Sequence, residues 1–150
     1  MAEKSDKYFL GKVYDLKQSE MLEERVVYDP DDLTTHGVIT GMTGSGKTGL
    51  GVIMLEEAAL QGIPAIVVDP KGDLTNLLLH FPDLLPEDFK PWIDRDAARR
   101  AGIEVEEAAQ KTAALWKNGL ASYGIEQPRL QALSESVDYA IYTPGSDAGL

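Results

Sequence analysis

The residues best suited to chemistry in this sequence stand together in one short loop, Gly41-Met-Thr-Gly-Ser-Gly-Lys-Thr48. Their spacing matches the pattern G-x-x-x-x-G-K-[ST], in which a glycine-rich turn aims successive backbone N–H groups at phosphate oxygens. Lys47 can reach the outer phosphates as a cation, and the Thr48 hydroxyl can complete the ligand shell of a magnesium ion. The loop therefore predicts a site for a nucleoside triphosphate with Mg²⁺.

The fixed glycines have separate duties in such a loop. Gly41 ends the preceding strand and turns the chain, while Gly44 and Gly46 allow backbone angles that other residues rarely adopt. A chance match to the whole pattern should arise in about one chain of this length in a few hundred. The residues predicted to bind the nucleotide are Gly41, Thr43, Gly44, Ser45, Gly46, Lys47, Thr48 and Gly49, and Lys47 is also the predicted catalytic residue.

The flanking sequence predicts the elements that must position this loop. Gly37–Thr40 is typical of a strand that runs directly into Gly41, and Lys47–Gln61 has the apolar spacing of a helix. Pro64–Val68 is an uninterrupted apolar run, as expected of a parallel strand buried on both faces. Strand, helix and strand form one right-handed βαβ unit. We interpret Gly49 and Gly51, inside the first turns of the helix, as allowing close approach of that helix to the sheet.

The remaining elements are expected on both sides of this unit. Short strands are predicted near Tyr8–Leu16 and Arg25–Tyr28, and another at Tyr139–Thr143. Helices are predicted at Leu74–His80 with Asp73 as its cap, at Asp96–Arg100, at Val105–Leu120 and at Pro128–Ser136. The buried stripe of the longest helix should comprise Val105, Ala108, Ala109, Thr112, Trp116 and Leu120.

Asp69 follows the second apolar run, and the sequence leaves its role open. If this strand neighbours the loop strand, the Asp69 carboxylate lies beside the metal and joins Thr48 as a magnesium ligand. If another strand intervenes, the metal-side carboxylate comes later in the chain. A third interpretation is structural: Asp69 starts the turn Asp69-Pro-Lys-Gly-Asp73.

Two other classes of nucleotide switch share parts of this pattern. A ParA-like ATPase carries a signature lysine where this sequence has Met42. A GTPase could use Asp69–Gly72 as its D-x-x-G turn, but no N-K-x-D guanine-reading motif follows it. Residues in the sequence therefore weaken both alternatives.

The segments His36–Thr48 and Asp69–Asp73 resemble the loop region and the D-P-K-G-[DE] segment of HerA/FtsK-type ATPases. Val26–Leu150, including Tyr142-Thr-Pro-Gly145, is similar to the N-terminal part of bacterial HerA-like ATP-binding proteins. The resemblance implies ATP and Mg²⁺ as cofactors, with Thr43–Gly46 as the phosphate cradle, Lys47 on the γ-phosphate and Thr48 on magnesium. It also implies that the complete protein forms a homo-oligomeric, hexameric ring that hydrolyses ATP to move DNA.

This sequence departs from the family pattern after Asp69. Relatives carry a later apolar strand that ends in Asp-Glu, whereas the last strand here, Tyr139–Thr143, ends in Thr-Pro. No arginine finger or DNA-facing pore loop can be identified. We therefore expect an α/β fold: an incomplete P-loop parallel sheet with a helical insertion and a small N-terminal β element. The β element should span 1–34 and the front of the ATPase domain 35–150, with the insertion at about 80–137.

Composition limits the partners. The chain has 150 residues, 43% of them hydrophobic, and a net charge of −11, which repels a nucleic-acid backbone. Arg95, Arg99 and Arg100 cluster, but acidic neighbours favour a solvated helix surface, so DNA contact is expected only through the complete protein. No apolar run approaches the roughly 20 residues that span a bilayer. The absence of cysteine excludes disulfides and permits the cytoplasm, where we expect the protein.

Three functional classes remain open at this point. The first is the motor ATPase, whose turnover DNA should stimulate. The second is a non-motor nucleotide switch that a partner reads through the helical insertion. The third is a nucleotide-binding fragment without hydrolytic activity.

Overall fold

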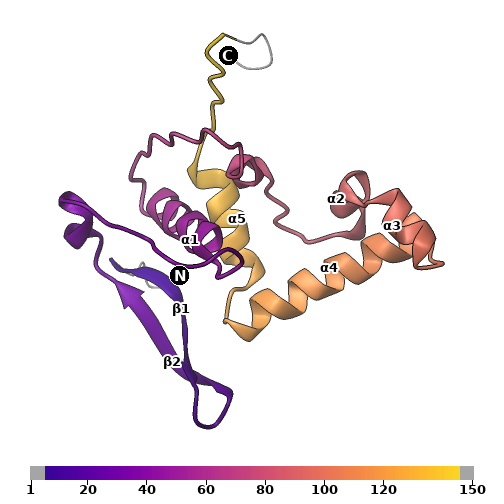
Figure 1. The fold of residues 1–150 in the computed structure, drawn as a ribbon, viewed down its shortest axis with the longest axis horizontal. Coiled ribbons are helices and arrows are strands. Elements are labelled where there is room, and N and C mark those ends of the chain that lie inside the picture. Colours follow the sequence, from indigo (N-terminus) through magenta and orange to yellow (C-terminus); the bar gives the residue numbers. More distant parts are fainter. Residues whose placement is uncertain (1–5, 146–150) are drawn as a thin grey trace. The chain divides into compact units, whose positions relative to one another are not determined.

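The computed structural model describes residues 6–145 and shows a mixed α/β chain (Figure 1). Its strands are β1 (Tyr8–Asp15) and β2 (Glu20–Tyr28). Its α-helices are α1 (Lys47–Leu60), α2 (Pro86–Phe89), α3 (Arg95–Arg100), α4 (Val105–Ser122) and α5 (Gln127–Ser136). Three 3₁₀ segments lie at η1 (Pro30–Thr34), η2 (Thr75–Leu78) and η3 (Lys90–Trp92).

The chain divides into two compact units, which we describe separately. The described part of the first unit comprises residues 6–10, 25–79 and 135–145 and contains the phosphate loop with α1. The second comprises residues 11–24 and 80–134 and contains α2, α3 and α4.

The two predicted N-terminal strands are confirmed, and β2 begins earlier than expected. They form a two-stranded sheet joined by a short turn. The Asp15 carboxylate shapes this turn, because it accepts the backbone N–H groups of Lys17 at 2.7 Å and Gln18 at 3.2 Å. At the base of the sheet the Arg25 guanidinium lies 4.2 Å from the centre of the Phe9 ring, a cation–π contact.

The predicted helix after the loop is confirmed as α1, and its end follows a known physical pattern. Gly62 adopts a left-handed φ of 75°, and the Ile63 N–H donates to the Ala58 carbonyl at 2.9 Å. This is a Schellman-type C-terminus, which a glycine favours because it has no Cβ to clash. The last turns of α1 are the buried ones, at Glu57, Ala58 and Ala59. Packing of its C-terminal half therefore fixes α1 in the first unit.

The predicted parallel sheet is wrong for the described residues. The sheet found in residues 6–145 consists of β1 and β2. None of the three predicted parallel strands forms: Gly37–Thr40, Pro64–Val68 and Tyr139–Thr143. A strand exists only when a neighbouring strand exchanges backbone hydrogen bonds with it, and these three segments are not paired with one another in this way. Some of their apolar side chains lie largely in solvent: Ile66 is 98% exposed and Val68 84%.

Three of the helices predicted further along the chain are confirmed as α3, α4 and α5. The predicted helix at Leu74–His80 is instead the 3₁₀ segment η2, which Asp73 does not cap. Sequence reasoning missed α2, a single turn that begins at Pro86. Phe89 of α2 is buried and meets Phe81 edge to face, with ring centres 5.0 Å apart.

The predicted stripe of α4 is only partly correct. α2 packs on α4, and η3 and α3 also contact it. Ala109 and Ala113 are buried on this face, whereas Trp116, which we expected there, is 53% exposed. Small alanines allow the short α2 to approach closely, and the larger Trp116 ring further along the helix stays about half exposed.

Candidate functional site

The loop 41–46 has the backbone geometry that the motif requires. Gly44 and Gly46 adopt φ values of 81° and 88°, in the left-handed region that strains residues with a Cβ. A Cβ built at either glycine would meet no atom within 4 Å. The space on that side of the loop is therefore open, so the glycines are needed for their backbone angles and leave room for a ligand.

The carbonyl oxygen of Met42 ties the loop together. It accepts the Ser45 backbone N–H at 3.2 Å and the Lys47 Nζ at 2.7 Å. A Cβ at Gly41 would clash with the Ser45 Oγ, so a larger residue at position 41 would require the Ser45 side chain to move. The Lys47 ammonium is thereby held over the loop, while the Met42 side chain projects into solvent.

The N-terminus of α1 continues directly from the loop. Its first intrahelical bond runs from the Leu50 N–H to the Gly46 carbonyl at 2.9 Å, so the amides of Lys47, Thr48 and Gly49 precede the helical ladder. No side chain caps this end, and its first turn contains no acidic residue. The positive end of the helix dipole is therefore available to an anion.

The chemistry of the loop residues fits a phosphate–magnesium ligand. Thr48 and Thr43 are exposed, and neither hydroxyl makes a hydrogen bond to another described residue. A free hydroxyl directly after the loop lysine can serve as an oxygen ligand to Mg²⁺. The loop residues named from the sequence thus lie together in one continuous turn.

Asp69 lies in the first unit, in a turn of its own. One carboxylate oxygen accepts the Gly72 N–H at 3.0 Å, and the other accepts the Leu74 N–H at 2.8 Å. These bonds, with that from Leu74 the strongest, hold the pKa of the Asp69 carboxyl below its ordinary value of 3.8. The hydrogen bonds of Asp69 stay within its own turn and do not reach the phosphate loop. No group of three His, Cys, Asp or Glu in residues 6–145 could hold a metal.

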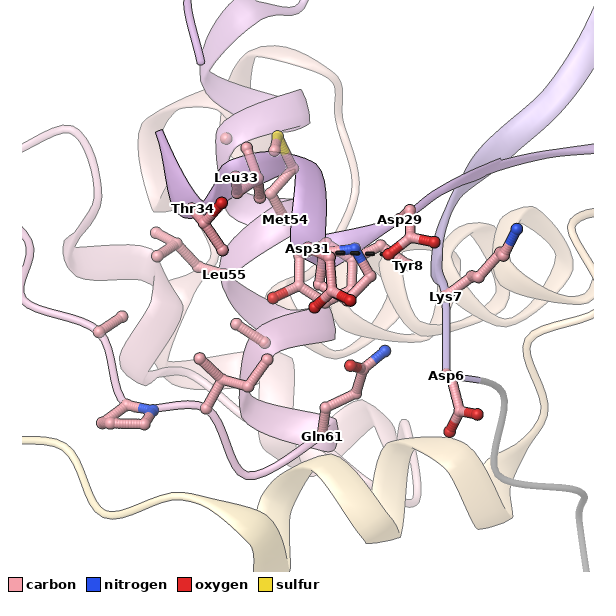
Figure 2. Close-up of a pocket in the computed structure, with 16 residues that line it drawn as sticks. Asp6, Lys7, Tyr8, Asp29, Asp31, Leu33, Thr34, Met54, Leu55 and Gln61 are labelled. Carbon is pink, nitrogen blue, oxygen red and sulfur yellow. Dashed lines mark hydrogen bonds between the residues drawn. The ribbon is translucent and has the colours of Figure 1, made fainter. Parts of the chain in front are cut away.

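Sequence reasoning missed a cavity of about 980 Å³ beside α1 (Figure 2). It lies in the first unit, between the start of β1, η1 and the middle of α1. Gly51 borders it. A Cβ at Gly49 or Gly51 would meet no atom within 4 Å, so the close approach of helix to sheet expected at these two glycines is absent. Burial and, to a lesser degree, the charge of Glu57 raise the pKa of Tyr8. Asp29, which caps η1, lies on the cavity wall.

The basic cluster lies elsewhere, in the second unit. Arg95, Arg99 and Arg100 are exposed on α3, and Arg99 pairs with Asp96 at 3.5 Å. Ion pairs of this kind on a helix surface are weak and keep both partners solvated. The cluster thus has the form expected of a solvated helix face.

The loop and the N-terminus of α1 together form a turn with the open backbone amides of an anion-binding site, and the sequence comparisons name the family. Residues 8–118, well over half of the chain, match the family described as "Helicase HerA, central domain". The chain therefore belongs to this family.

A curated relative supports the same assignment over a shorter segment. The chain is 46% identical over 50 residues to the type 4 coupling protein DotL of Legionella pneumophila subsp. pneumophila (strain Philadelphia 1). The match covers 33% of this chain and 6% of DotL, so the chain corresponds to a small part of that protein. No solved structure matches. Among the helices of residues 6–145, none is long and apolar enough to cross a membrane.

The contacts of Asp69 generate a pH prediction. Because its pKa is lowered in the folded chain, its carboxylate contributes stability above the unfolded value near 3.8, and this contribution is lost as the pH falls through the folded pKa. Asp69→Asn should therefore lower the stability at pH 7 and flatten its decline at acid pH. Urea denaturation followed by circular dichroism from pH 7 to about pH 3 measures both. A variant with the wild-type stability and acid slope would contradict the turn contacts.

Proposed function

We propose that this chain binds ATP with Mg²⁺ through residues 41–49. In the complete protein this site would belong to a HerA/FtsK-type motor that couples ATP hydrolysis to the movement of DNA. The observation that carries the proposal is the loop itself: left-handed Gly44 and Gly46 leave an open cradle, and Lys47 is folded over it. Membership of the HerA family supports it.

Each loop residue has a role in this proposal. The backbone N–H groups of the loop and of the first turn of α1 donate to the phosphate oxygens. Lys47 exchanges its hydrogen bond to the Met42 carbonyl for one to the outer phosphate, and the Thr48 hydroxyl binds magnesium. Magnesium supplies charge neutralisation on the phosphates when bound. The protein contributes by positioning and by stabilising negative charge, so Lys47 is the residue on which the chemistry depends most.

We assign Asp69 first to the turn Asp69–Asp73, because each of its carboxylate oxygens already accepts a backbone N–H. A second role as a magnesium ligand would require the Asp69 carboxylate to lie beside the Thr48 hydroxyl. ATP is preferred to GTP because of the family membership and because no N-K-x-D motif follows the loop.

The larger assembly is proposed for the complete protein. We place a β element at residues 1–34, the front of the ATPase domain at 35–150 and a helical insertion at about 80–137. A homo-oligomeric ring acting on DNA in the cytoplasm follows from the family resemblance. The net charge of −11 and the paired state of Arg99 make this chain by itself a poor binder of DNA.

Lys47→Ala should weaken the binding of Mg-ATP by roughly 10- to 100-fold, because charge-assisted hydrogen bonds contribute about 1.5–3 kcal/mol each. The measurement is isothermal titration calorimetry of the purified chain. The matched control is Lys117→Ala, which removes an exposed lysine from α4 in the second unit. Equal affinity of the wild-type chain and Lys47→Ala for Mg-ATP would contradict the assignment of residues 41–49 as the nucleotide site.

Hydrolysis is a separate question, because the second candidate function is a binding site without turnover. The contacts of both Asp69 oxygens favour it. We expect the chain to bind Mg-ATP yet release phosphate no faster than Lys47→Ala does, with or without DNA. Phosphate release that depends on Lys47 would contradict this expectation and make Asp69 the metal-side carboxylate. Stimulation by DNA would place motor activity within these residues.

A further inference from the structure

All of the sulfur in this chain belongs to methionine, because the sequence has four methionines and no cysteine. Thiols are the usual first targets of mild oxidants, so here an oxidant that attacks sulfur must attack methionine. The structure describes three of the four, and they differ in exposure. Met42 is 84% exposed, Met21 is 44% exposed, and Met54 is half-buried in α1. Among the described residues, Met42 is therefore the methionine that a dissolved oxidant meets most readily.

Met42 also lies within the phosphate loop. Its carbonyl oxygen accepts the Lys47 Nζ at 2.7 Å and the Ser45 N–H at 3.2 Å. The oxidisable sulfur and the oxygen that holds the lysine thus belong to one residue. A chemical change at the sulfur takes place within one side-chain length of the carbonyl that holds the Lys47 ammonium.

Oxidation by a peroxide gives a methionine side chain a new hydrogen-bond acceptor. The sulfur lone pair attacks one peroxide oxygen, the O–O bond breaks, and the transferred oxygen becomes the oxygen of a sulfoxide. Sulfur loses two electrons, hydrogen peroxide gains them, and the second oxygen leaves as water. The apolar thioether becomes a polar group, and its oxygen carries partial negative charge. A lysine ammonium can donate a hydrogen bond to such an oxygen.

We propose that Met42 is an oxidation site that regulates the phosphate loop. Its sulfoxide competes with the phosphate for the Lys47 ammonium and weakens the binding of Mg-ATP. This effect on nucleotide binding rests on the proposed function of residues 41–49, whereas the site of oxidation does not. Methionine sulfoxide can be reduced enzymatically, so the loss of affinity is reversible. The sulfoxide carries no net charge, so it weakens the site without abolishing it.

Mapping the oxidised residues tests the site without any nucleotide. The folded chain is treated with dilute hydrogen peroxide, and the sulfoxide formed at each methionine is followed by peptide mass spectrometry. Met42 should oxidise several-fold faster than Met21 or Met54, because its side chain is the most exposed of the three. In urea the three rates should converge. A folded chain in which Met21 or Met54 oxidises as fast as Met42 would overturn the assignment.

The affinity for Mg-ATP before and after peroxide treatment, measured by calorimetry, tests the consequence. Oxidation should weaken binding by the wild-type chain roughly three- to tenfold, since one hydrogen bond is worth about that factor. Methionine sulfoxide reductase should restore the affinity. The matched control carries Met21→Leu and Met54→Leu, keeps Met42, and should lose the same factor. Met42→Leu should lose none, relative to its own affinity before treatment.

Unchanged affinity of a wild-type chain that is oxidised at Met42 would overturn the regulatory role. So would a Met42→Leu chain that loses as much affinity as the wild type on oxidation. A chain that fails to bind Mg-ATP before any treatment would contradict the proposed function and the effect of oxidation on it. In that case the mapping would still confirm or overturn Met42 as the oxidation site, so the two failures are distinguishable.

Discussion

The candidate site depends on the carbonyl oxygen of Met42. This acceptor holds the Ser45 N–H and the Lys47 ammonium at once, and it closes the loop into a turn with its glycines in left-handed conformations. Holding the Lys47 side chain over the loop costs conformational entropy, so a hydrogen-bond acceptor such as a carbonyl or a phosphate oxygen is needed to keep it there. The chain supplies the carbonyl, and a phosphate oxygen is a stronger acceptor for the same ammonium because it is charged. The loop is therefore arranged before any ligand binds.

The helix behind the loop carries this arrangement into the fold. α1 presents an uncapped N-terminus without acidic neighbours to the loop, and it is anchored at its other end by buried residues and by the Gly62 terminus. The unpaired N–H groups at the N-terminus of α1 can donate hydrogen bonds to a bound anion, which offsets the free energy lost by leaving them uncapped. The predicted strands before and after α1 differ from the loop, because within the described residues they are not paired into a sheet. They are Gly37–Thr40, Pro64–Val68 and Tyr139–Thr143. The described part of the first unit thus has a loop whose backbone geometry suits an anion, whereas its apolar segments are not paired into a sheet.

The loop could be predicted from the sequence because its requirements are local. Glycine spacing, a lysine and a threonine determine the turn almost independently of the rest of the chain, and the left-handed Gly44 and Gly46 follow. Helices α1 and α4 were predicted for the same reason, since their periodicity lies within one segment. The predicted parallel strands are absent from the described residues. A strand such as Pro64–Val68 exists only when another segment pairs with it, and the local sequence does not show whether that happens. The exposure of Trp116 and the turn contacts of Asp69 likewise depend on neighbours that periodicity does not reveal.

The most direct test of the account is to follow the backbone amides of the ¹⁵N-labelled chain by NMR as Mg-ATP is added. Phosphates seated in the loop should shift the amides of Gly44, Gly46, Lys47, Thr48 and Gly49 first and most strongly, with smaller changes beyond the first turns of α1. Magnesium alone should produce little of this effect. Saturable changes centred anywhere else in residues 6–145, or none at millimolar Mg-ATP in a folded chain, would contradict the assignment of the loop as the nucleotide site.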